Sequence, residues 1–150
     1  MLSPGDTAPT ADLLNQAGET FDWTSITGHR TLVFFYPKAS TPGCTQQACA
    51  LRDIIGQVGD TRIVGVSPDK PATQLKFADK YELTYPLLAD TEHVLADAYG
   101  VWQEKVNYGK RYMGVVRSAF LVDATGTLEQ VWYKISPKDT PVKLLEALAL

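Results

Sequence analysis

The pattern of hydrophobic and polar positions predicts strands and helices that alternate in the first part of the chain. Residues 31–36 and 62–67 are runs of β-branched and aromatic side chains, which are typical of strands buried on both faces. Residues 41–55 and 69–81 follow these runs and carry apolar side chains at helical spacing. Pro37 closes the first run. The order strand, helix, strand, helix is therefore expected.

The pattern changes in the second part of the chain. A short helix is expected between Thr91, as its N-cap, and Gly100, where a helix would stop. Residues 118–133 predict a β-hairpin that turns at 124–126. The segment 140–150 has the pattern of an amphipathic closing helix. We therefore expect an α/β fold with a mixed sheet, parallel in its first part and antiparallel in the C-terminal hairpin, with helices on both faces.

Composition narrows the class of protein. The chain has 150 residues without an internal repeat or linker, so one domain over residues 1–150 is expected. Hydrophobic residues make up 45% and charged residues 21%, which excludes disorder and fibrous repeats. The net charge is -3 without a block of Lys or Arg, so neither nucleic acid nor a membrane is an expected partner. The longest apolar run, 32–36, is far shorter than the ~20 residues of a bilayer span.

The start of the chain lacks the charged and apolar regions of a secretory signal, so the cytoplasm is the expected compartment. In a reducing compartment, the two cysteines of the sequence are more often reactive than structural.

Cys44 lies near the first turn of a predicted helix, for which Ser40 or Thr41 is the N-cap. Free backbone N–H groups and the helix dipole favour a thiolate there. A buried, unreactive Cys44 remains the alternative.

The spacing of Cys44 and Cys49 limits how they can bond. Five residues along an ideal helix place two Cα atoms about 8.7 Å apart, whereas a disulfide requires less than about 7 Å. The two residues can therefore bond only when the helix unwinds, which indicates a transient pair. Together with His29 and His93 they give no zinc-type spacing, so neither a metal nor a cofactor is expected.

The segment 35–45, Phe-Tyr-Pro-Lys-Ala-Ser-Thr-Pro-Gly-Cys-Thr, resembles the active-site segment of peroxiredoxins. Pro37, Thr41 and Cys44 stand in the Pro-x-x-x-Thr-x-x-Cys arrangement of that family. Cys49, five residues further on, is similar to the second cysteine of the Q-type or bacterioferritin comigratory protein subfamily. The resemblance extends over nearly the whole chain and includes residues 5–9, 64–69, 77–81, 85–90, 99–102 and 112–120.

This resemblance implies a thioredoxin-like fold and a thiol peroxidase activity. Cys44 would be the peroxidatic cysteine that becomes a sulfenic acid, and Cys49 the resolving cysteine that forms an intramolecular disulfide with it. The substrates would be hydrogen peroxide and organic hydroperoxides. The reductant would be thioredoxin, with glutaredoxin as a second candidate, and the chain would be a monomer or a weak dimer.

The same resemblance assigns roles around the thiolate. Arg117 would place a fixed cation beside it. The Thr41 hydroxyl, Arg117 and the backbone N–H groups of Gly43 and Cys44 would hold the peroxide oxygens, and Pro37 would shield the site from water. Trp102, Tyr112 and Met113 are candidates for lining the peroxide entrance, because they flank the stretch that leads to Arg117.

The chain departs from the family pattern at several positions. Ala39 and Ser40 stand where acidic residues are frequent, and Ala119 where Thr is common. Gln47 stands where Glu is frequent, and it lacks the charge that could orient Arg117.

Two other functions stay open. A general thiol-disulfide oxidoreductase normally uses a C-x-x-C pair, which is absent here, and a redox-sensing module would expose a melted helix to a partner.

Overall fold

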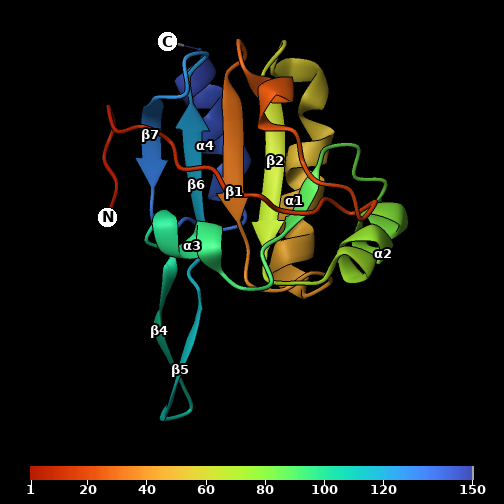
Figure 1. Cartoon of the computed structure of the whole chain (residues 1–150), viewed down its shortest axis with the longest axis vertical. Helices are drawn as coiled ribbons and strands as arrows, with labels where there is room; N and C mark the ends of the chain where they lie inside the picture. Colours follow the sequence, from red (N-terminus) through yellow and green to blue (C-terminus); the bar gives the residue numbers. More distant parts are fainter. Residues whose placement is uncertain (150) are drawn as a thin grey trace.

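A five-stranded mixed sheet forms the centre of the computed structural model, which describes residues 1–149 (Figure 1). The strand order is β3-β2-β1-β6-β7. The bounds are Thr31–Phe35 for β1, Arg62–Ser67 for β2, Leu87–Ala89 for β3, Ser118–Val122 for β6 and Leu128–Trp132 for β7. Strands β1, β2 and β3 are parallel, and β6 runs antiparallel to β1 and β7. The expected mixed sheet and its C-terminal hairpin are therefore confirmed.

Helices cover both faces of the sheet, as expected (Figure 1). Helices α1 (Pro42–Asp53), α2 (Pro71–Tyr81) and α4 (Asp139–Leu148) pack on one face, and α3 (Val94–Ala98) and the N-terminal segment pack on the other. Successive side chains of a strand point to opposite faces. Strand β1 therefore supplies Leu32 and Phe34 to the first hydrophobic core and Val33 and Phe35 to the second.

The predicted helix ends need small corrections. Helix α1 ends at Asp53, and Ile55, expected on its buried face, is instead exposed in the 3-10 helix η2 (Ile55–Gln57). Helix α2 buries Gln74, Phe77 and Ala78 against the sheet. Leu148 ends α4, and the last residue of the expected closing helix, Leu150, lies outside the described residues.

The prediction that Thr91 caps α3 was wrong. The N-cap is His93, which adopts a left-handed conformation with φ of 47°. The first turn is satisfied instead by the buried carboxylate of Asp90, which accepts hydrogen bonds from the backbone N–H groups of Leu95 and Ala96 at 3.2 and 2.8 Å. Asp90 reaches past the N-cap because the intervening residues form a turn.

A second antiparallel pair, β4 (Trp102–Asn107) and β5 (Lys110–Val115), was not predicted from the sequence. It projects away from the body of the molecule (Figure 1). Most of its side chains are exposed on both sides, so the alternation that marks a half-buried strand is missing. At its base, the Trp102 ring stacks on His93 with centroids 4.0 Å apart. Among the described residues, no helix is long and apolar enough to span a membrane.

Candidate active site

Cys44 lies in the first turn of α1, immediately after the loop that leaves β1. Thr41 is the N-cap and Pro42 the first helical residue, whose fixed φ and missing N–H suit that position. The Thr41 hydroxyl makes no cap hydrogen bond and donates instead to the Lys38 carbonyl at 2.7 Å. The Cys44 side chain is buried, and its thiol is free. The helix start therefore presents uncapped N–H groups beside the sulfur.

Arg117 places a guanidinium directly beside this sulfur. Its Nη2 lies 3.5 Å from Cys44 Sγ, and its Nη1 donates to Gln47 Oε1 at 2.8 Å. The sheet register explains the meeting, because Ser118 pairs with Phe35 at the end of β1. The residue before β6 therefore reaches the loop after β1. The structure brings Arg117 and Cys44 together, although 73 positions separate them in the chain.

Gly43 gives the guanidinium room to approach. A Cβ atom at this position would lie 3.1 Å from Arg117 Nη2 and 3.5 Å from Pro137 Cγ. A contact of 3.1 Å is tighter than almost all real Cβ contacts, so a larger residue would push the guanidinium away. Gly43 thus leaves room for the close packing of Arg117 and Pro137 on the helix start.

The loop between β1 and α1 is held by Asp69, a residue for which the sequence analysis predicted no role in the site. Asp69, after β2, accepts hydrogen bonds on Oδ2 from the Ala39 backbone N–H and the Ser67 hydroxyl, both at 2.7 Å. Within this loop Ser40 adopts a left-handed conformation with φ of 64°. Pro37 is half-buried at the end of β1. Asp69 therefore fixes the path of the chain just before the cysteine helix.

Cys49 is half-buried and free, and α1 continues without a break from Cys44 through Cys49. The Tyr85 hydroxyl donates to the Ala48 carbonyl at 2.8 Å and braces this part of the helix. Burial raises the pKa of Tyr85 well above its ordinary value. The phenol therefore stays protonated and keeps donating.

A second cation, Lys105 on β4, was also missed from the sequence. Its Nζ donates to the Val115 carbonyl at 3.0 Å. Burial and, secondly, the positive charge of Arg117 lower the pKa of Lys105, while the charge of Cys44 acts in the opposite direction. The hairpin thus brings a lysine into the electrostatic field of the site. On the same hairpin, Tyr112 and Met113 are about half exposed.

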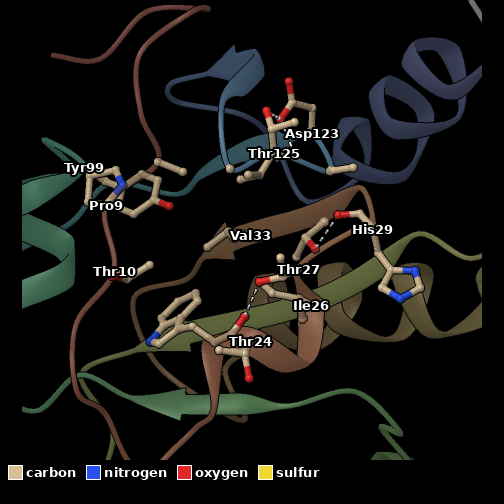
Figure 2. Close-up of a pocket in the computed structure, with 16 residues that line it drawn as sticks. Pro9, Thr10, Thr24, Ile26, Thr27, His29, Val33, Tyr99, Asp123 and Thr125 are labelled. Carbon is tan, nitrogen blue, oxygen red and sulfur yellow. Dashed lines mark hydrogen bonds between the residues drawn. The ribbon is translucent and has the colours of Figure 1, made fainter.

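A pocket of about 190 Å³ lies elsewhere, around the start of β1 and the turn between β6 and β7 (Figure 2). Val33, Ile26 and Tyr99 are among its apolar lining residues, and Thr10 and Thr125 are among its polar ones. Its lining includes neither cysteine nor Arg117. It is therefore separate from the candidate active site. Within residues 1–149, no group of three or more His, Cys, Asp or Glu side chains is arranged to hold a metal ion.

Comparison with known proteins places this geometry in a family. The model of the AhpC/TSA family matches residues 4–131. Peroxiredoxin Bcp of Bacillus subtilis is 42% identical over 146 residues, which cover 96% of this chain and 93% of that protein. Peroxiredoxin Bcp of Escherichia coli K12 is 45% identical over 133 residues, which cover 87% of this chain and 85% of that protein.

Solved structures agree with these relatives. Peroxidoxin BcpB of Mycobacterium tuberculosis is similar with a TM-score of 0.85 and 32% identity, over 99% of this chain and 97% of that one. The bacterioferritin comigratory protein of Xanthomonas campestris, described for its alkyl peroxide reduction activity, gives a TM-score of 0.86 and 30% identity, over 93% and 90% of the two chains.

The fold and the buried cysteine beside a guanidinium define a thioredoxin-fold thiol peroxidase. The chain belongs to the AhpC/TSA family and is a peroxiredoxin, an enzyme that uses a thiol to reduce a hydroperoxide. It is similar to the Bcp and Q-type peroxiredoxins.

Proposed function

We propose that Cys44 is the peroxidatic cysteine. The observation that carries this assignment is the 3.5 Å contact between Arg117 Nη2 and Cys44 Sγ at the start of α1. A guanidinium and uncapped helix N–H groups both stabilise a negative sulfur. Cys49 has a different setting, since it lies in the second turn of the helix and farther from its N-terminus. The thiolate is the nucleophile in thiol chemistry, so the reaction begins at Cys44.

Donors and acceptors around the sulfur suit the two ends of a hydroperoxide. The Thr41 hydroxyl donates its proton to the Lys38 carbonyl. Its oxygen can therefore only accept a hydrogen bond from the O–H of the substrate. Arg117 and the N–H groups of Gly43 and Cys44 are donors, and they stabilise the negative charge that develops on the leaving oxygen. Pro37, at the end of β1, excludes water from this side.

The reaction follows in balanced steps. The Cys44 thiolate attacks one oxygen of ROOH, the O–O bond breaks, and the other oxygen leaves as an alcohol after taking a proton. Cys44 is oxidised to a sulfenic acid and ROOH is reduced to ROH. The Cys49 sulfur then displaces hydroxide from Cys44 to form the disulfide, with release of water. Part of α1 unwinds in this step, because an intact helix holds the two Cα atoms about 8.7 Å apart.

The disulfide is reopened by an external dithiol. Thioredoxin is the proposed reductant and glutaredoxin the second candidate, since both exchange thiols with disulfides. Hydrogen peroxide and small organic hydroperoxides are the proposed substrates, in line with the alkyl peroxide reduction described for the Xanthomonas campestris relative. The enzyme is proposed to act in the cytoplasm as a single-domain monomer or weak dimer.

A coupled assay tests this proposal. Peroxide-dependent oxidation of NADPH is followed with thioredoxin and thioredoxin reductase. The wild-type chain should turn over continuously, Cys44→Ser should give no consumption, and Cys49→Ser should be oxidised once and then stall. Equal residual turnover in both variants would contradict the assigned roles. A single oxidation of the wild type without turnover would favour a redox sensor, and rapid reduction of insulin would favour a general thiol-disulfide oxidoreductase.

A further inference from the structure

A chain of hydrogen bonds joins the reactive cysteine to the first turn of the C-terminal helix. Arg117, which contacts Cys44, donates through Nη1 to Gln47 Oε1 at 2.8 Å. Gln47 Nε2 in turn donates to Thr140 Oγ1 at 2.9 Å. The Thr140 hydroxyl donates to the Ser136 carbonyl at 2.8 Å. These four contacts therefore connect α1, the start of β6 and α4 around one guanidinium.

The donor and acceptor roles in this series of hydrogen bonds are fixed. A hydroxyl has a single proton, and the Thr140 hydroxyl donates its proton to the Ser136 carbonyl. Thr140 can then only accept from Gln47, so the NH₂ group of the amide faces Thr140. The amide oxygen is thereby turned toward Arg117, as the guanidinium requires, since it has donors only. If the amide were flipped, its NH₂ group would face the N–H donors of Arg117, and two donors would oppose each other.

Burial makes this orientation matter. Gln47 and Thr140 are both completely buried, so water does not replace a lost partner at low cost. The segment before α4 also packs on the site, because Pro137 Cγ lies 3.5 Å from where a Cβ of Gly43 would stand. The orientation of the guanidinium thus depends on a threonine that lies outside the cysteine helix.

We propose that Thr140 is a positioning residue for peroxide reduction: by accepting from Gln47, it holds the amide oxygen toward Arg117 and so keeps the guanidinium on the Cys44 sulfur. This inference rests on the proposed function of Cys44. Thr140 acts only through Gln47 and Arg117. It should therefore have no effect on the guanidinium when residue 47 has no amide to orient.

This last point gives a double-mutant test. Thr140→Val keeps the volume and removes the hydroxyl, Thr140→Ser keeps the hydroxyl, and Gln47→Met removes the amide that Thr140 would orient. Thr73→Val, an exposed threonine on α2, is the matched control. Two quantities are measured for each variant in both backgrounds: kcat/KM for hydrogen peroxide as a function of pH, and the rate at which iodoacetamide alkylates Cys44 when Cys49 is replaced by Ser. Thermal unfolding records the change in stability.

The expected result is a loss of about three- to tenfold in kcat/KM for Thr140→Val, the effect of one buried hydrogen bond. The pH midpoint of both reactions should move upward, and Thr140→Ser and Thr73→Val should stay close to wild type. In the Gln47→Met background, Thr140→Val should cost less than about twofold, which is the non-additivity of coupled residues. Equal losses in both backgrounds, or a loss without a change in the pH midpoint, would show a purely structural role and overturn the inference.

Failure of the proposed function would look different. If Cys44→Ser still consumed peroxide, the assignment of Cys44 would be wrong whatever the Thr140 variants did. If Cys44→Ser were inactive and Thr140→Val behaved like wild type in every measurement, only the role of Thr140 would be refuted.

Discussion

Replacing Arg117 by Met tests the electrostatic part of the proposed mechanism. Met approximates the length and volume of the aliphatic stem but has no charge and no N–H donor. The variant removes the 3.5 Å contact with Cys44 Sγ and the hydrogen bond to Gln47. The thiolate should therefore be less stable, and peroxide reduction should require a higher pH.

The size of the effect follows from the distance. At the 3.5 Å separation of Nη2 and Sγ, two unit charges attract by about 1 kcal/mol at the dielectric constant of water and about 5 kcal/mol at an effective constant of about 20. Arg117 is half-buried, so the effect should lie between these limits. Since about 1.4 kcal/mol corresponds to a factor of ten in rate, peroxide consumption at neutral pH should slow by about ten- to a thousandfold, and the midpoint of its pH dependence should rise.

Initial rates of peroxide consumption and of Cys44 alkylation, measured across a wide pH range, give this midpoint. Arg117→Lys keeps the charge but cannot reach Sγ and Gln47 with one planar group, so it should fall between wild type and Arg117→Met. Arg111→Met is the control, because Arg111 has a side chain that is 78% exposed and pairs with Glu104 on the hairpin. The reasoning would be refuted by an unchanged midpoint in Arg117→Met, or by an equal shift in Arg111→Met.

Three further changes test other parts of the account. Gly43→Ala should lower kcat/KM severalfold with little loss of stability, because its Cβ would stand 3.1 Å from Arg117 Nη2; an unchanged kcat/KM would show that the guanidinium does not need this space. Tyr85→Phe removes a hydroxyl that braces α1, so disulfide formation after one equivalent of peroxide should accelerate by about fivefold, the effect of one hydrogen bond of about 1 kcal/mol; stopped-flow rates equal to wild type would exclude this brace. Hydrogen bonds from the Thr127 backbone and the Thr125 side chain hold the pKa of Asp123 below its ordinary value. The charged carboxylate therefore stabilises the fold at any pH above the unfolded-state pKa of about 3.9. This stabilisation is lost as the pH falls through the lower pKa of the folded state. The stability advantage of the wild type over Asp123→Asn, measured by urea unfolding, should therefore be constant near neutrality and disappear in acid, and an advantage independent of pH would contradict this assignment.

Four of the five strands of the buried sheet, all but the short β3, could be predicted because they carry strong signals. The run at 31–36 is apolar without interruption, and β1 is completely buried in the structure. The hairpin of β4 and β5 gave no such signal, since most of its side chains are exposed on both faces. The cap of α3 shows a different difficulty. Thr91 and Asp90 are both capable caps, and only the turn between them and the helix decides which side chain reaches the N–H groups.

Only some residues of the candidate site could be predicted from the sequence. Cys44, Thr41 and Gly43 follow one another in a motif, so their grouping could be read from the sequence. Arg117 was indicated by resemblance alone, and its approach to Cys44 depends on the pairing of β1 and β6. Thr140 and Lys105 carried no local signal. Thr140 reaches Gln47 from α4, and the projecting hairpin brings Lys105 into the electrostatic field of Arg117 and Cys44.

The most direct test of the central claim is to locate the first oxidised sulfur by mass spectrometry. The reduced protein receives one equivalent of hydrogen peroxide in the presence of a reagent that traps sulfenic acids, and the cysteine-containing peptides are then identified. The account predicts a trapped sulfenic acid on Cys44 in the Cys49→Ser variant, and a bond between Cys44 and Cys49 within one chain of the wild type. A trapped sulfenic acid on Cys49 while Cys44 remains a free thiol would contradict it.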